Sequence, residues 1–104
     1  MMDTPAEDDA SAGAFSSGGD GWRFAGALTL DDAARVFAAS NAVALPASGV
    51  VDFSAMTRAD SSALAIVIAL KRRAAAEGRT LSIQGVPASL HSLAVVYGVD
   101  NLLA

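Results

Sequence analysis

Residues 49–84 restrict the fold more than any other part of the sequence, because a helix-like segment separates two strand-like segments there. Residues 49–53 are apolar and β-branched apart from Asp52, as in an interior strand of a mostly parallel sheet. Residues 80–84 alternate in polarity, which indicates a second strand. Since one helix and two short loops join these strands, we predict a right-handed βαβ crossover and therefore an α/β fold.

The connecting helix carries signals at both of its ends. Asp60 is predicted to cap its N-terminus after a loop at residues 54–59, and Gly78 is predicted to end it in a left-handed conformation. The side of the helix that faces the sheet is expected to carry Leu64, Val67, Ile68 and the stem of Lys71. These signals predict one uninterrupted helix that reaches Glu77.

Two elements are predicted before this unit. Residues 22–26 alternate large apolar with small or polar side chains, which indicates a short strand with Trp22 and Phe24 on one face. Thr29 is in position to cap a helix that runs to about Ser40.

A last helix is predicted over residues 88–97, and Gly98 is in position to end it. Its apolar side chains recur at the spacing of one helix face: Leu90, Leu93, Ala94 and Tyr97. We expect Leu93 and Tyr97 to pack in the core rather than to form a binding stripe. The alternative is that a helix beside Ser61 adds exposed apolar contacts.

The length of the chain, 104 residues, leaves room for one folded domain. Residues 1–20 mix Asp, Ser, Gly, Ala and Pro without an apolar period, so burial there cannot offset the entropy of ordering the chain. We therefore predict a flexible N-terminal tail over residues 1–20 and a folded domain over residues 21–104.

Charge limits the kinds of partner that the chain can bind. The net charge is −4, and the seven basic residues include a single cluster at residues 71–73. We therefore expect a protein partner and no nucleic-acid partner. The cluster is predicted to form a solvated rim, with a contact to an acidic partner as the alternative.

No segment predicts direct insertion into a membrane. The longest strongly apolar stretch, residues 61–70, ends at Lys71 and is far shorter than a membrane span. The N-terminus carries acidic residues and lacks the basic start and apolar run of a signal peptide. We therefore expect a cytoplasmic location.

Catalytic and metal-binding patterns are weak. The single histidine, His91, has no carboxylate near it in sequence, so we expect a structural role, with catalysis or metal binding as alternatives. Asp52 and Asp60 lack the neighbouring ligands of a metal site, and the glycines at 18–21 neither follow a strand nor open a helix. The absence of cysteine removes thiol nucleophiles. We expect no metal, no cofactor and no enzymatic activity.

The segment Asp60–Leu64 is the strongest candidate site. If Asp60 caps the helix, Ser61 lies in the first turn, where unpaired amides and the helix dipole favour an added negative charge. A phosphate on Ser61 would be tolerated locally and would add roughly −1.5 to −2 charges to a partner surface. Serine is also common in first turns for structural reasons, so the pattern leaves both a phosphoacceptor and a structural serine open.

Several of these segments together resemble the STAS domain of anti-anti-sigma factors and their relatives. The resemblance covers about residues 22–103 and rests on Val50–Ser54, Asp60–Leu64, Gly78 and Thr80–Val86. Within the family, residues 64–68, 81–86 and 93–97 look most similar to the MlaB-like group.

This resemblance implies a STAS-like single domain, with a small mixed β-sheet and helices packed mainly on one side. It also implies a partner-binding surface at Asp60, Ser61, Ser62, Ala63 and Leu64. For the MlaB-like group the implied partner is the ATPase subunit of a Mla-type ABC complex, which transports phospholipid and supports outer-membrane lipid asymmetry. The chain would be its non-catalytic regulatory or stabilising subunit, held peripherally at the inner membrane by the complex.

The wider family implies a second role. For an anti-anti-sigma factor the implied partner is an anti-sigma serine kinase, and Ser61 would be its phosphoacceptor. The sequence departs from the family pattern at Ala63, where many members have glycine.

Overall fold

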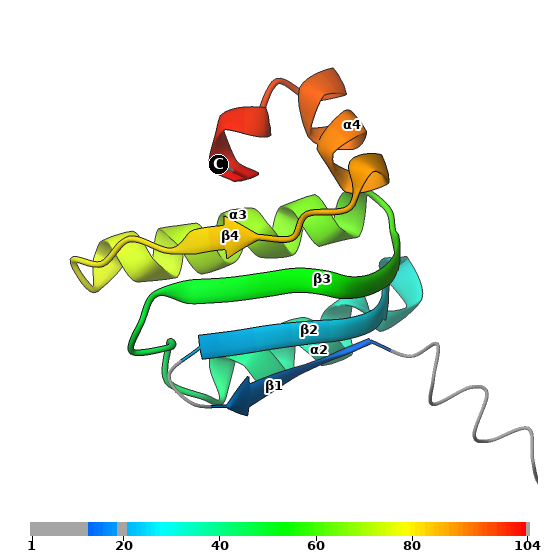
Figure 1. The fold of residues 1–104 in the computed structure, drawn as a ribbon. Helices are drawn as coiled ribbons and strands as arrows, with labels where there is room; N and C mark the ends of the chain where they lie inside the picture. The colour runs from blue at the N-terminus through cyan, green and yellow to red at the C-terminus, as the bar shows by residue number, and fades with distance from the viewer. Residues whose placement is uncertain (1–12, 19–20, 104) are drawn as a thin grey trace, which may run out of the picture.

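The computed structural model describes residues 13–18 and 21–103. Its elements follow in the order β1 (Ala14–Gly18), β2 (Gly21–Leu28), α2 (Leu30–Asn41), β3 (Val50–Ala59), α3 (Ser61–Ala76), β4 (Ser82–Gln84), α4 (Ala88–Val96) and the 3₁₀ helix η1 (Asp100–Leu103). Figure 1 shows these elements as one domain built from a sheet and its helices. The predicted α/β class is confirmed.

The strands form one mixed sheet in the order β1-β2-β3-β4. β1 and β2 are antiparallel, whereas β2 with β3 and β3 with β4 are parallel. β3 therefore lies in the interior of the sheet, as its apolar sequence predicts. The chain passes from β3 through α3 to the parallel β4, which confirms the predicted βαβ unit.

Helices α2 and α3 cover one face of the sheet, behind the strands in Figure 1. α4 and η1 lie beyond the β4 edge, and η1 packs against α3 and β4. Side chains along β2 reflect this layering, because Trp22 and Phe24 are buried while Arg23 and Ala25 are exposed on the opposite face. The prediction of helices mainly on one side is confirmed.

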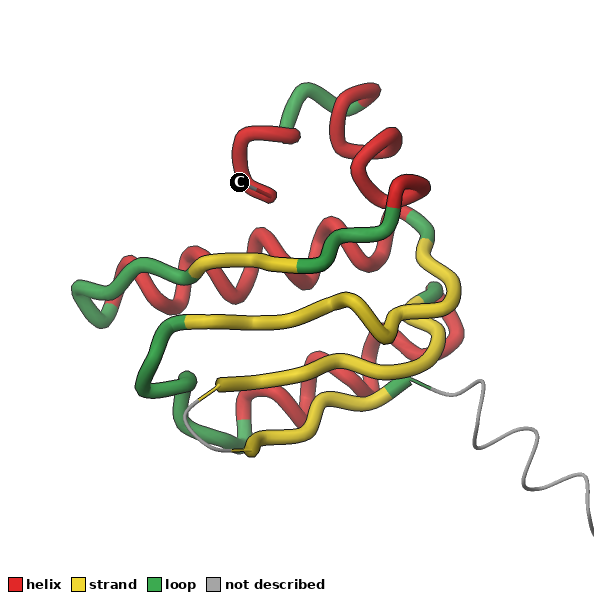
Figure 2. The backbone as a smooth tube through the Cα atoms, in the orientation of Figure 1, coloured by secondary structure: helices red, strands yellow, loops and turns green. Residues whose placement is uncertain are grey.

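β3 is longer than the sequence predicts, as the continuous yellow segment in Figure 2 shows. The loop predicted at residues 54–59 is wrong, because β3 continues to Ala59 and stays paired with β2 up to Leu28. The pairing register shifts twice on the way, after Arg23 and after Gly26. Such irregularities disturb the strict alternation of polarity on which strand prediction relies.

The remaining predicted elements differ by a few residues. β4 covers residues 82–84 of the predicted 80–84. α3 ends with Glu77 as its C-cap, and Gly78 follows at a φ of +72°, so the left-handed helix end is confirmed. At the end of α4, Leu93 is half-buried, but Tyr97 is 59% exposed, so the expectation that Tyr97 packs in the core is wrong.

The fold begins before residue 21. β1 lies within the predicted tail and pairs with β2 from Ala14 to Gly18, so that prediction is wrong for these residues. The rest of the predicted tail, residues 1–12 and 19–20, lies outside the described residues. Phe15 attaches β1 to the domain, because its ring centroid lies 5.0 Å from that of Phe24. Its ring also contacts Trp22 and Phe53, at 5.3 Å and 6.2 Å.

The role of Phe15 can be tested by truncation. We expect Phe15→Ala to lower the free energy of unfolding by about 2 kcal/mol, since roughly half of a fully buried phenylalanine's contribution is at stake. Urea denaturation followed by circular dichroism measures this change, with Ser17→Ala on the same strand as the control. Equal stability of the two variants would show that β1 does not contribute to the core.

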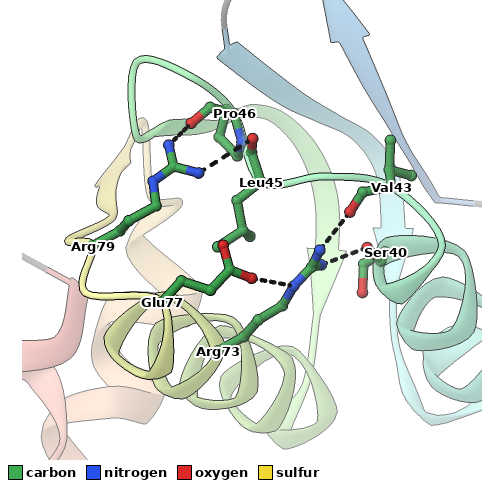
Figure 3. A network of polar contacts seen from close by, with 7 residues as sticks. All are labelled: Ser40, Val43, Leu45, Pro46, Arg73, Glu77 and Arg79. Atoms are coloured by element: carbon green, nitrogen blue, oxygen red, sulfur yellow. Dashed lines mark hydrogen bonds and ion pairs between the residues drawn. The ribbon is translucent and has the colours of Figure 1, made fainter.

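Two arginines attach the loop after α2 to the far end of α3 (Figure 3). Arg73 donates to the carbonyl oxygens of Ser40 (2.9 Å) and Val43 (2.6 Å), and it forms an ion pair with Glu77. Arg79 donates to the carbonyls of Leu45 and Pro46. The predicted solvated rim is therefore wrong for Arg73, which satisfies carbonyls at and beyond the C-terminus of α2.

This network predicts different roles for neighbouring arginines. We expect Arg73→Met to lower the free energy of unfolding by about 1–3 kcal/mol, because two charge-assisted hydrogen bonds are lost. Arg72→Met is the matched control, since Arg72 is exposed and has no hydrogen bond or ion pair within residues 13–18 and 21–103. It should change stability by less than about 0.5 kcal/mol. Equal losses in the two variants would contradict the assignment.

Candidate protein-docking surface

One carboxylate joins the starts of the two helices that cover the sheet. Asp60 is the N-cap of α3, where its Oδ1 accepts a hydrogen bond from the Ser62 amide at 2.8 Å, as predicted. Its Oδ2 accepts a second bond, at 3.0 Å, from the amide of Leu30, the first residue of α2. Asp60 therefore serves two helix N-termini at once.

The predicted cap of α2 is only half right. Thr29 occupies the N-cap position in an extended conformation, but its side chain makes no capping hydrogen bond. Its carbonyl accepts from the Asp32 amide at 2.9 Å, which closes the first turn of the helix. The side-chain acceptor at this N-terminus comes instead from Asp60, thirty residues away in sequence.

Burial and hydrogen bonds act in opposite directions on the pKa of the Asp60 carboxyl. Desolvation by burial raises the pKa of this carboxyl, but the bonds from Leu30 and Ser62 favour the charged form, and the net pKa lies below the ordinary value of 3.8. The pKa of Asp52 is also lowered, chiefly by its bond from the Ser54 amide. A Cβ at Gly85 would lie 2.7 Å from this same Asp52 oxygen, so the backbone at Gly85 packs directly against Asp52.

The lowered pKa of Asp60 predicts a stability change in acid. A carboxylate with a depressed folded-state pKa stabilises the fold above its unfolded pKa, and this contribution disappears as pH falls through the folded value. We therefore expect Asp60→Asn to lose part of the acid dependence of stability below about pH 4. Urea denaturation of both proteins from pH 7 to pH 2.5 measures this. Superimposable pH profiles would contradict the role given to the charge.

The two serines after Asp60 face different neighbours. Ser61, the first residue of α3, is exposed and lines a groove of about 370 Å³ with Tyr97 and Val99, which follow α4. Ser62 is half-buried and lines a second groove, of about 380 Å³, on the α2 side. Ala65 on α3 borders both grooves.

Large apolar side chains are exposed along both grooves. Leu30 and Phe37 of α2 are 75% and 40% exposed at the second groove, and Tyr97 is 59% exposed at the first. We call the outer side of the first half of α3 together with these two walls the docking surface. Its residues are Leu30, Ala33, Ala34, Phe37, Ser61, Ser62, Ala65, Ile68, Ala69, Tyr97 and Val99.

Not every predicted site residue is available at this surface. Ala63 has no exposed area, so its prediction as a partner contact is wrong; its small side chain instead lets α3 pack closely on the core. Leu64 is 5% exposed and forms part of the floor of the groove beside Ser61. Asp60 is bonded to the starts of both helices, Ser61 is exposed, and Ser62 is half-buried in the groove on the α2 side.

Other candidate chemistry does not converge on a site. His91 is exposed on α4. Among the residues that the structure describes, no group of three His, Cys, Asp or Glu side chains could hold a metal ion. None of the helices in this part of the chain is both long and apolar enough to cross a membrane.

The mixed sheet, its one-sided helices and the exposed apolar surface beside a helix N-terminus define a small interaction domain. A family model described as "Mlab, STAS domain" matches residues 19–104. The chain therefore belongs to the STAS domain family, and within it to the MlaB-like domains. STAS domains generally act through protein–protein interaction. A comparison with curated proteins finds no match.

The sequence offered an exposed apolar helix beside Ser61 only as an alternative, and it did not point to the wall formed by α2. Leu30 directly follows the capping position and Phe37 follows the buried Val36, so helical periodicity alone placed neither in a binding role. Their signal is a large apolar side chain off the buried face of a helix. That signal is weak, because single exposed hydrophobic residues are common on protein surfaces.

Proposed function

We propose that this STAS domain is a non-catalytic regulatory and stabilising subunit that binds the ATPase of a phospholipid-transport ABC complex of the Mla type. The observation that carries the proposal is the docking surface, where exposed apolar side chains of α2 and of the segment after α4 line the two grooves beside the first half of α3, with Ser61 in the groove beside Tyr97. The MlaB-like family membership supports the kind of partner. The complex would act in outer-membrane lipid asymmetry and hold the domain peripherally at the inner membrane.

The mechanism is an equilibrium coupled to docking. The ATPase buries Leu30, Phe37 and Tyr97 in its own surface, which removes apolar area from water and favours binding. Because the domain binds one conformation of the ATPase more tightly than others, it raises the population of that conformation. The STAS domain itself needs no nucleotide, metal or catalytic group for this role.

A charge at Ser61 tests the interface. We expect Ser61→Asp to weaken binding to the ATPase by about 1–3 kcal/mol, since a carboxylate loses its hydration when the surface is covered. Ser61→Ala should bind as the natural protein does. Ser89→Asp is the matched control, because Ser89 is an exposed serine in the first turn of α4, outside the docking surface.

The measurement is affinity of the purified variants for the purified ATPase subunit by isothermal titration calorimetry. Binding by Ser61→Asp as tight as that of Ser89→Asp would exclude the docking surface. The partner itself is tested by purifying the tagged domain from its own cells and identifying what accompanies it. Recovery of an ABC ATPase with its membrane subunits is expected, and a complex without any ABC component would exclude the transporter role.

The alternative is an anti-anti-sigma factor whose partner is an anti-sigma serine kinase. The exposure of Ser61 at the first position of α3 supports it, because the hydroxyl is accessible and the helix dipole stabilises a phosphate there. In that reaction Ser61 Oγ attacks the γ-phosphorus of kinase-bound ATP, ADP leaves, and the hydroxyl proton passes to a base of the kinase. Recovery of such a kinase together with phosphorylated Ser61 peptides would replace the transporter proposal.

A further inference from the structure

Asp60 makes hydrogen bonds to both sides of the turn that leads from β2 into α2. Its backbone amide donates to the Leu28 carbonyl, and its Oδ2 accepts from the Leu30 amide. Leu28 and Ala59 are also paired in the sheet, so both strands end at the same level. The start of α2 is therefore held from the start of α3.

The hydrogen bond to Asp60 is what satisfies the Leu30 amide. The first amides of a helix have no partner within the helix, and the Thr29 side chain supplies none here. The hydrogen bond to Asp60 is charge-assisted and is therefore stronger than a hydrogen bond between an amide and a neutral carbonyl. Leu30 is also the most exposed large apolar side chain of the docking surface, at 75%. The Asp60 carboxylate therefore holds the residue that begins this wall.

Ser61 lies directly beside the same carboxylate. A negative group at Ser61 repels Asp60 and competes with it for the first-turn amides of α3, to which Asp60 is bonded through Ser62. The carboxylate can reduce this repulsion by rotating away, and rotation breaks the bond to Leu30. A charge on the side of α3 that faces Tyr97 therefore acts on the wall formed by α2 as well.

We propose that Asp60 is a positioning residue that couples the N-terminus of α3 to α2, so that a charge added at Ser61 changes the geometry at Leu30. The inference deepens the proposed function and rests on it for its biological consequence. A charge at Ser61 would then alter both grooves of the docking surface: the groove beside Tyr97 directly, and the groove beside Leu30 through Asp60.

Asp60→Asn separates the two hydrogen bonds. The asparagine oxygen can still accept from Ser62 and keep α3 capped, since asparagine is as good an N-cap as aspartate. The asparagine nitrogen cannot accept from Leu30. In nuclear magnetic resonance experiments on the free domain, we expect the Leu30 amide to exchange with water about tenfold faster, while the Ser62 amide changes little. Unchanged exchange at Leu30 would overturn the proposal.

Leu30→Pro removes the donor instead of the acceptor. Proline is well suited to the first position of a helix, and Thr29 already has the extended backbone that a residue before proline requires. This variant provides a second way to break the bridge if Asp60→Asn fails to fold. It leaves the charge of Asp60 in place.

The coupling itself is measured with Ser61→Asp. In the natural background we expect its amide chemical-shift changes to extend from residues 61–65 of α3 to residues 31–37 of α2. In the Asp60→Asn or Leu30→Pro background, the changes at 61–65 should remain and those at 31–37 should disappear. Equal changes along α2 in all backgrounds would refute the coupling.

These measurements need no partner, so they fail independently of the proposed function. If the ATPase does not bind the natural domain, the proposed function fails while the resonance data still decide the coupling. If binding is confirmed, Ser61→Asp should weaken it by a larger factor in the natural background than in the Asp60→Asn background. An equal loss of ATPase affinity in the two backgrounds would show that the coupling through Asp60 does not contribute to binding.

Discussion

The carboxylate of Asp60 accepts a hydrogen bond from the first turn of α3 and another from the first residue of α2. Each bond satisfies an amide that has no partner within its own helix. The two helices thus leave adjacent parallel strands at a fixed relative position, and the groove between them takes its shape from that position. The two bonds use the two separate oxygens of the carboxylate, and an asparagine in its place would offer a nitrogen, which cannot accept, at one of these positions.

The opposite ends of the same helices are attached by a second device. Arg73 donates to carbonyls at and beyond the C-terminus of α2, and Arg79 holds the loop that leads to β3. α2 and α3 are therefore joined at both ends by polar contacts and between them by the aliphatic core. This leaves their outer sides available, and the exposed apolar area there is consistent with a domain that works by contact with another protein.

Both the STAS family membership and the position of Ser61 at the docking surface point to a role for this residue in partner contact. The residue is exposed at the start of α3, where a negative charge is stabilised by the helix dipole, and exposed apolar walls lie on both sides of that helix. Under the proposed function this surface binds its partner when uncharged, and an added charge weakens the contact. That property suits both a constitutive subunit and a phosphorylation-controlled one, so the partner rather than the domain decides which of the two operates.

Local sequence determined the βαβ unit, the Asp60 cap, the Gly78 helix end and the exposed Ser61, because each depends on residues close together in the chain. Tertiary structure decided the rest. β1 forms because Phe15 reaches the rings of Phe24 and Phe53, and β3 extends to Ala59 because β2 pairs with it despite two register shifts. The second bond of Asp60 and the wall at Leu30 depend on contacts across thirty residues, which periodicity and capping rules do not describe.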